Sequence, residues 1–164
     1  LLAKTSLPEI NAVMAHELGH YVLNHPFKLV LQMGLVLTAG FAFTQWAQRR
    51  LVARWGSAWG LRGPDDVAGL PVVIALLSVW FFLMTPVTNS IVRIAESEAD
   101  MFRLNAARQP HAFASAAMRL AAYRKLEPTA LEEIVFFDHP SGRTRVRMSM
   151  TWFAENPSEG AAAR

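Results

Sequence analysis

The sequence SLPEINAVMAHELGHYVLNHP occupies residues 6–26 and contains a helix start, a metal-ligand pattern and a helix end. Ser6 and Glu9 have the spacing of a capping box, and Pro8 is compatible with a first helical turn. Asn24-His25-Pro26 is typical of a helix end. We therefore predict a single helix between these two signals. Its apolar face would consist of Ile10, Val13, Met14, Leu18 and Tyr21.

Within that helix, His16 and His20 stand four positions apart, and Glu17 directly follows the first histidine. Residues i and i+4 of a helix share one face and lie about 6 Å apart, so both imidazoles can bind one Zn²⁺. Glu17 would then reach a water at the metal and act as a general base. Hydrolysis by a metal-activated water is therefore the leading hypothesis for this chain.

A catalytic zinc site takes three protein ligands, so the two histidines leave one ligand to be found. One metalloprotease pattern places a third histidine six residues after the second, but that position is Pro26. His25 lies five residues after His20, where a continuous helix turns away from the ligand face. We expect a helix-end or surface role for His25.

Two carboxylates at helical spacing are the remaining ligand candidates. Glu96 and Asp100 are i and i+4, so one helical face presents both. Glu98 would lie about 200° around the helix from Glu96 and point away. We expect Glu96 to be the third ligand and Asp100 to accept the free ring N–H of a ligating histidine. The alternative, an ordinary solvated acidic turn, is disfavoured only by the preceding histidine pattern.

The composition narrows the choice of partners and ligands. Hydrophobic residues make up 52% of the 164 residues and charged residues 18%, with a net charge of +3. The 16 Lys and Arg form no block and are not interleaved with aromatic residues, so we expect no nucleic-acid partner. The absence of cysteine leaves histidine and carboxylate as metal ligands. The chain begins at Leu1 without a methionine, and we expect it to be an excerpt of a longer protein.

Two apolar stretches, at 29–47 and 67–87, follow the histidine pattern. Each is about 20 residues long, the length that crosses the hydrocarbon core of a bilayer. The segment 55–64 between them is rich in Trp and Gly, as at a membrane interface. We predict a transmembrane helical hairpin over residues 28–87, with the lipid bilayer as partner. A pair of buried core helices is the alternative.

Lys and Arg residues flank the hairpin equally on both sides, so the positive-inside rule leaves its orientation open. The loop side carries Arg49, Arg50, Arg54 and Arg62, and the other side carries Lys28, Arg93, Arg103 and Arg108.

The rest of the chain predicts further helices and no convincing strand, so the expected fold class is all-α. The helix beyond the second apolar stretch should continue to about Ala107, and Pro110 and Pro128 should each open another. After a turn at 138–142, a basic last helix should follow. The tail at 156–164 is rich in Pro, Ser, Gly and Ala, and we expect it to be frayed.

On spacing alone, His139 would end a helix and Arg145 would belong to a solvated basic face. Three blocks nevertheless occur in a specific order: His-Glu-Leu-Gly-His at 16–20, Arg-x-x-Glu-x-x-Ala-Asp at 93–100 and His-Pro-Ser-x-x-x-Arg at 139–145. Together they resemble the membrane-embedded zinc endopeptidases of the type I CAAX prenyl-protease group, which also contains the bacterial heat-shock membrane protease.

The resemblance spans roughly residues 1–152 and implies a zincin-like helical catalytic domain at 1–155, interrupted by the hairpin. It assigns His16, His20 and Glu96 as ligands of one Zn²⁺ per chain, Glu17 as general base, Asp100 as the partner behind a ligand, and His139 and Arg145 as substrate or transition-state contacts. We expect the Phe136-Phe137 pair to anchor the turn that bears His139.

The function that the resemblance implies is hydrolysis of a polypeptide substrate at the membrane, as in CAAX protein processing, with the site on the cytoplasmic side. A quality-control protease of the heat-shock type is the alternative. A catalytically inactive membrane scaffold is a second alternative, against which the intact Glu17 argues. Two departures stand out: Val92 replaces a serine that the family often has, and the N-terminal membrane helices and substrate-binding strand are absent from this chain. The oligomeric state is left open.

Overall fold

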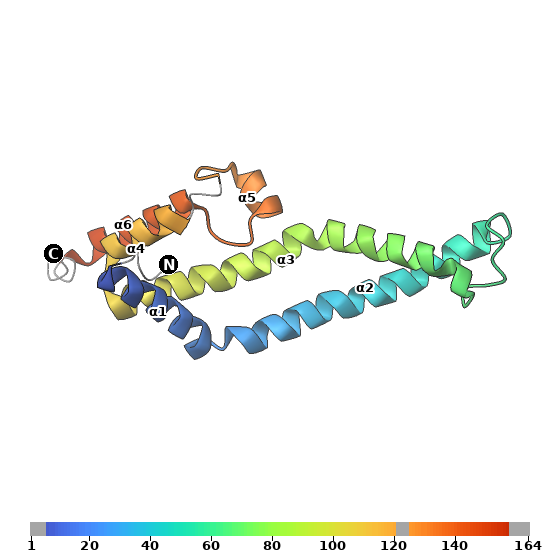
Figure 1. Ribbon diagram of the computed structural model, residues 1–164, viewed down its shortest axis with the longest axis horizontal. Helices are drawn as coiled ribbons and strands as arrows, with labels where there is room; N and C mark the ends of the chain where they lie inside the picture. The colour runs from blue at the N-terminus through green and yellow to red at the C-terminus, as the bar shows by residue number, and fades with distance from the viewer. Residues whose placement is uncertain (1–5, 121–124, 158–164) are drawn as a thin grey trace. The chain divides into compact units, whose positions relative to one another are not determined.

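The computed structural model describes residues 6–120 and 125–157 and forms only helices over those ranges (Figure 1). This confirms the all-α fold class. Residues 121–124 and 158–164 lie outside the described ranges, and with them most of the predicted frayed tail. The elements are α1 (Leu7–Val22), α2 (His25–Trp55), a short 3₁₀ helix (Val67–Gly69), α3 (Leu70–Ala107), α4 (Pro110–Leu120), α5 (Ala130–Phe136) and α6 (Gly142–Glu155).

The chain divides into two compact units, and the long helices α2 and α3 each contribute to both. The hairpin unit comprises residues 30–88. The second unit combines residues 1–29 with 89–164, so it contains the ends of α2 and α3 together with α1, α4, α5 and α6. All of the predicted site residues belong to this second unit, which we call the motif unit.

In the hairpin unit, α2 and α3 pack through one close approach. A Cβ on Gly40 would lie 2.6 Å from the indole nitrogen of Trp80, so only glycine leaves room for this ring. The Trp80 indole N–H donates to the carbonyl of Val36 at 3.2 Å, and Phe43 stacks on Trp80 with ring centroids 5.3 Å apart. The predicted antiparallel pairing of the two apolar stretches thus has a specific contact.

Both helices are long and apolar enough to cross a membrane. They extend beyond the predicted stretches, since α2 starts at His25 and ends at Trp55. Only 11% and 6% of the residues in their most apolar windows are buried within this chain. Large apolar side chains such as Val30, Leu35 and Phe82 are well exposed. The alternative of two buried core helices is therefore not supported within this chain.

The helix that carries the histidine pattern begins as predicted and is tied to α4. Glu9 accepts hydrogen bonds from the backbone N–H of Ser6 at 2.8 Å and from the Ser115 hydroxyl at 3.0 Å. The first bond satisfies a free donor at the helix start, and the second links α1 to α4.

Two predicted boundaries are corrected. Asn24, with φ of 58°, separates α1 from α2, but His25 starts the next helix instead of merely ending the first. Pro26 is compatible with this, because proline is well tolerated in a first helical turn. Likewise α5 begins at Ala130 rather than at Pro128, because Thr129 is its N-cap and accepts from the backbone N–H of Glu132.

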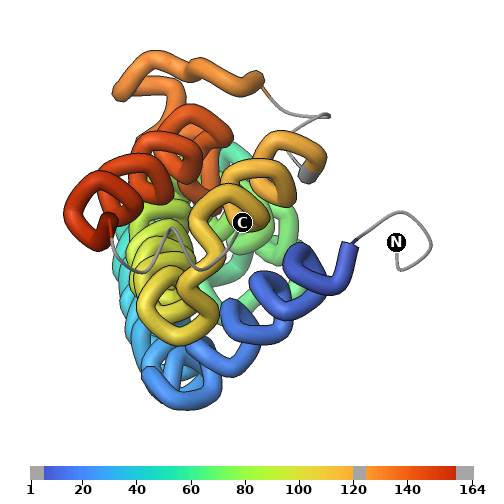
Figure 2. The backbone as a smooth tube through the Cα atoms, turned by 90° about the vertical axis from the view of Figure 1, so that its left-hand side faces the viewer, coloured from blue at the N-terminus to red at the C-terminus, as the bar shows by residue number. Residues whose placement is uncertain are grey.

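The core of the motif unit lies between α4 and α6. It consists of Leu104, Phe113, Ala117 and Trp152, with Met148 packed against them. Helix α4 contacts both α1 and α6, and Figure 2 shows it between them. The apolar side chains of Phe113 and Ala117 on α4 are buried in this core. This packing brings the first and last described helices into one unit.

Candidate metal centre

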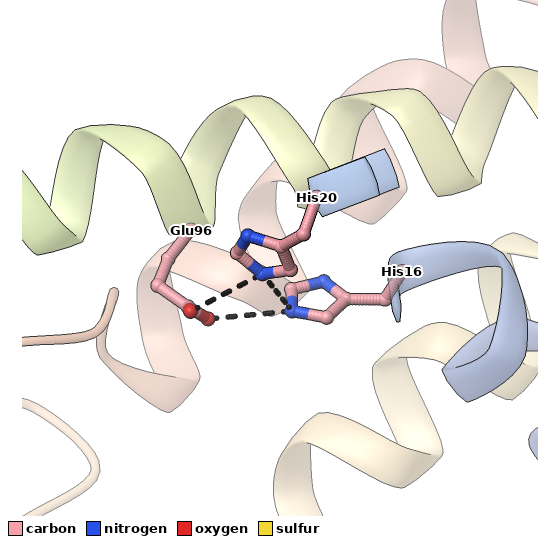
Figure 3. A group of neighbouring side chains, drawn as sticks. All are labelled: His16, His20 and Glu96. Atoms are coloured by element: carbon pink, nitrogen blue, oxygen red, sulfur yellow. Dashed lines mark hydrogen bonds and ion pairs between the residues drawn. The ribbon is translucent and has the colours of Figure 1, made fainter. Parts of the chain in front are cut away.

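Helix α1 presents His16 and His20 to Glu96 on α3, and the three side chains converge on one point (Figure 3). The Nε2 atoms of the two histidines lie 3.1 Å apart. Glu96 places Oε2 3.4 Å from His16 Nε2 and Oε1 3.4 Å from His20 Nε2. The structure therefore brings together the three residues that the sequence predicts as ligands.

These separations fit a metal ion. Ligand atoms 2.0–2.2 Å from a tetrahedral Zn²⁺ lie about 3.3–3.6 Å from one another. The two histidine–glutamate separations of 3.4 Å fall in that range, and the histidine–histidine separation of 3.1 Å is slightly shorter. Two imidazoles and one carboxylate are also a donor set typical of catalytic zinc. The residues present therefore fit the group that the pattern predicts.

Gly19 allows α1 to lie close enough to α3 for this convergence. A Cβ at this position would stand 3.3 Å from the Cα of Ala99 and 3.1 Å from the ring of Phe102. A larger residue would require Phe102 or the backbone at Ala99 to shift. The glycine within the histidine pattern thus serves packing between the two helices that carry the predicted ligands.

Asp100 is fully buried directly behind His16. Its Oδ1 lies 3.0 Å from His16 Nδ1. Arg103 Nη2 lies 2.9 Å from Oδ1, and Arg145 Nε donates to Oδ2 at 2.7 Å. The buried carboxylate is thus compensated by two guanidinium groups.

The third sequence block reaches the same place from α6 and the turn before it. Arg145 donates from Nη2 to Glu96 Oε2 at 3.0 Å, in addition to its bond to Asp100. His139 Nε2 lies 3.4 Å from the same Glu96 oxygen, and His139 Nδ1 lies 3.0 Å from Asp138 Oδ1. Spacing alone predicts that Arg145 belongs to a solvated face and that His139 ends a helix. The structure instead places both side chains beside Glu96.

Arg93 anchors the turn that bears His139. Its Nη1 donates to the carbonyl oxygens of Glu133 at 2.7 Å and Phe137 at 2.6 Å, at the C-terminal end of α5. Asn89 adds a bond from Nδ2 to the carbonyl of Val135 at 2.7 Å. The predicted anchor, Phe136-Phe137, is wrong for its first member, since Phe136 is 75% exposed. Hydrogen bonds to free helix-end carbonyls hold this turn instead.

His25 and Glu98, which the sequence directs away from the site, meet behind His20. His25 is only 1% exposed. Its Nδ1 lies 2.9 Å from His20 Nδ1, and its Nε2 lies 2.9 Å from Glu98 Oε2. The expectation of a surface or helix-end role assumed one continuous helix, but the break at Asn24 turns His25 back towards His20. The proline after His25, which suits the first turn of a new helix, was the only signal in the sequence for this break.

The surroundings of His16 and His20 shift the pKa values of the two rings in opposite directions. Burial lowers the pKa of His20, and the neighbouring His16 lowers it further. Burial also opposes protonation of His16, but Asp100 and Glu96 outweigh it and raise the pKa of that ring. A neutral His20 retains the lone pair that a metal needs.

A cavity of about 310 Å³ opens onto these side chains. Glu17 is exposed to solvent and lines it, next to His16. The wall also includes Val13, Glu96, Arg103, Ala117, His139, Pro140, Gly142 and Arg145. The cavity therefore places the Glu17 carboxylate and the His139 ring around one space with two of the predicted ligands, His16 and Glu96.

Comparison of the sequence with known proteins relates this chain to peptidases. The sequence pattern of Peptidase family M48 matches residues 1–152. An "Uncharacterized metalloprotease YhfN" of Bacillus subtilis is 32% identical over 148 residues, which cover 89% of this chain and 35% of that protein. A "Protease HtpX homolog" of Bacteroides fragilis is 27% identical over 155 residues, covering 91% of this chain and 47% of that protein. The chain thus spans less than half the length of these relatives. No solved structure matches the chain significantly.

Proposed function

Because the chain belongs to peptidase family M48, we propose that it forms the catalytic part of a membrane-bound zinc endopeptidase. The observation that carries the proposal is the convergence of His16, His20 and Glu96 at the cavity that Glu17 lines. The reaction would be hydrolysis of a peptide bond in a polypeptide substrate by an activated water.

The two imidazole Nε2 atoms and the Glu96 carboxylate would hold one Zn²⁺ per chain. When bound, Zn²⁺ supplies Lewis-acid chemistry: it makes a water more acidic and polarises the carbonyl of a peptide bond. Asp100 would orient the His16 ring from behind, since its Oδ1 lies 3.0 Å from the other ring nitrogen.

Glu17 would act as the general base. Its side chain is exposed at the cavity, directly after His16 in the helix, so a water in that cavity is within its reach. It would accept the proton of the attacking water and return it to the leaving amine.

His139 and Arg145 would assist in different ways. The His139 side chain is 37% exposed and lines the cavity, so it can donate a hydrogen bond to the oxyanion that develops during hydrolysis. Arg145 uses Nε and Nη2 on Asp100 and Glu96, and we assign it the role of holding these carboxylates in place.

The variant Glu17→Gln in the full-length protein would test this mechanism. This variant should retain its zinc and lose peptide cleavage by about 10²–10⁴-fold or more, because the base is gone while the ligands remain. Glu127→Gln is the matched control, since Glu127 is an exposed glutamate outside all three blocks. Cleavage by Glu17→Gln at the wild-type rate would refute the mechanism. Absence of cleavage in the wild type would favour the inactive scaffold.

We further propose that α2 and α3 cross the bilayer and that the catalytic site lies on the cytoplasmic side. The exposed apolar surfaces of both helices support this. The chain has no cysteine, so single cysteines can be placed at Ser57, in the hairpin loop, and at Glu127. A membrane-impermeant maleimide should label Ser57→Cys only from outside and Glu127→Cys only from the cytoplasm. Labelling of both positions from one side would contradict the spanning hairpin.

Two substrate classes follow from the resemblance. Processing of CAAX proteins requires a prenylated C-terminal peptide, whereas a quality-control protease of the heat-shock type cuts unfolded polypeptides. Purified full-length enzyme should be offered a prenylated peptide, its unprenylated twin and an unfolded membrane protein. Preference for the prenylated twin identifies the first class, and cleavage of the unfolded protein without that preference identifies the second.

A further inference from the structure

Behind the predicted ligand His20 lies a pair of residues that the proposed mechanism does not use. His25, the first residue of α2, and Glu98 on α3 are joined by a contact of 2.9 Å between His25 Nε2 and Glu98 Oε2. The other ring nitrogen of His25 lies 2.9 Å from Nδ1 of His20. The three side chains therefore form a continuous line from Glu98 to the metal-facing histidine.

The ring nitrogen that His20 turns towards the other predicted ligands determines where the protons along this line lie. His20 points Nε2 towards His16 and Glu96, so binding through Nε2 requires the proton on Nδ1. The only group within hydrogen-bonding distance of that N–H among the described contacts is Nδ1 of His25, which must accept it. The proton of His25 then lies on Nε2 and is donated to Glu98. Each bond fixes the next tautomer.

The two predicted histidine ligands thus differ in what lies behind them. His16 faces the carboxylate of Asp100 directly, at 3.0 Å. His20 reaches its carboxylate only through the ring of His25, which is 99% buried and is held between the two partners. We propose that His25 and Glu98 are positioning residues, which fix the ring orientation and tautomer of His20 for metal binding. This proposal rests on the proposed function.

A merely structural role for the pair would be to link the start of α2 to α3. Lys28 Nζ, 3.9 Å from the same Glu98 oxygen, could share that task. Such a link would stabilise the fold but would leave the affinity for zinc unchanged. Metal affinity, measured separately from folding, therefore distinguishes the two roles.

The experiment measures zinc affinity of the full-length protein by competition with a chelator, alongside the thermal midpoint of the metal-free form. His25→Ala should weaken zinc binding by about 10- to 100-fold, the usual cost of losing a group that orients a ligand. His25→Asn, which can place an amide oxygen near the former Nδ1, should recover most of that loss. Glu98→Ala should weaken binding less than His25→Ala, and Glu98→Gln least, because glutamine keeps an acceptor oxygen.

Two further measurements complete the design. In the double variant His25→Ala/Glu98→Ala, removal of Glu98 should add nothing, because its effect passes through His25. His111→Ala and Glu127→Ala, which change an exposed histidine and an exposed glutamate elsewhere, are the matched controls and should bind zinc as the wild type does.

Wild-type affinity in Glu98→Ala, or additive losses in the double variant, would overturn the proposal. Glu98 is about half exposed, so this variant tests it even if His25→Ala does not fold. Loss of zinc on changing Glu96, but not on changing His25 or Glu98, would refute this inference alone. Failure of the wild type to bind zinc would refute it together with the proposed function.

Discussion

Several hydroxyl groups of the hairpin unit and the charged groups of the motif unit find their hydrogen-bond partners in different ways. In the hairpin unit, several hydroxyls bond the backbone of their own helix, as Thr38 does to Gly34, Ser78 to Ile74 and Thr85 to Phe81. In the motif unit, side chains bond other elements, as Arg145 does to Glu96 and Asp100. Polar groups that make their hydrogen bonds within one helix are suited to the interior of a bilayer, where no water is available as a partner.

The difference shows where chemistry is possible. The hairpin can present apolar side chains such as Leu35 and Phe82 to its surroundings without leaving those hydroxyls unpaired. The motif unit gathers carboxylates, histidines and arginines whose charges are balanced by one another, with a cavity at the centre. Substitutions in the two units should therefore have different effects, on metal and turnover in one and on helix packing in the other.

The largest effect is expected for Glu96→Gln. A neutral amide is a poor zinc ligand, and the substitution also removes one of the two negative charges that Arg145 contacts, so the full-length protein should lose its zinc and its peptidase activity. Elemental analysis of the purified protein measures the metal. Glu127→Gln is the control and should retain one zinc per chain. Full zinc content in Glu96→Gln would remove Glu96 from the ligand set.

A smaller loss is expected for His139→Ala, which leaves the three proposed ligands in place. The value of kcat should fall by about 10²–10³-fold, the usual effect of losing one oxyanion donor, while the zinc content stays unchanged. His111→Ala removes an exposed histidine that does not line the cavity, and this variant should turn over normally. Unchanged kcat in His139→Ala would return this histidine to a structural role.

In the hairpin unit, Gly40→Ala should affect packing and not zinc. A Cβ at Gly40 would meet the Trp80 indole at 2.6 Å, so the ring must move and its bond to Val36 weakens. We expect a loss of about 1–3 kcal/mol in the free energy of unfolding, measured in detergent. Gly34→Ala is the matched control, because nothing lies within 4 Å of its Cβ. Equal stability of the two variants would show that the Trp80 contact does not hold the hairpin.

The smallest effect is expected for Glu9→Gln at the start of α1. The backbone N–H and hydroxyl of Ser6, together with the Ser115 hydroxyl, lower the pKa of Glu9 in the folded protein. Its contribution to stability is therefore complete above the unfolded value of about 4.3 and is lost as the pH falls through the lower folded pKa. The thermal midpoints of wild type and variant should differ at pH 7 and converge in acid. A difference independent of pH would exclude the carboxylate as its cause.

Much of the fold follows from local signals in the sequence. The capping residues Ser6 and Glu9 define the start of α1, and the two apolar stretches predict the long helices because hydropathy and length act within one segment. His16 and His20 share a face because a helix repeats every 3.6 residues. The same periodicity places Glu96 and Asp100 on one face and Glu98 on another, and both residues of the first face lie beside His16.

Tertiary structure decided the surroundings of these residues. The break at Asn24 turns His25 inward, where it meets Glu98, although periodicity directs both residues away. Arg93, rather than the exposed Phe136, holds the turn of His139, because its guanidinium reaches carbonyls about 40 residues further along the chain. Spacing within a helix determines which side chains share a face. What that face meets depends on how separate helices pack, and local periodicity carries no information about it.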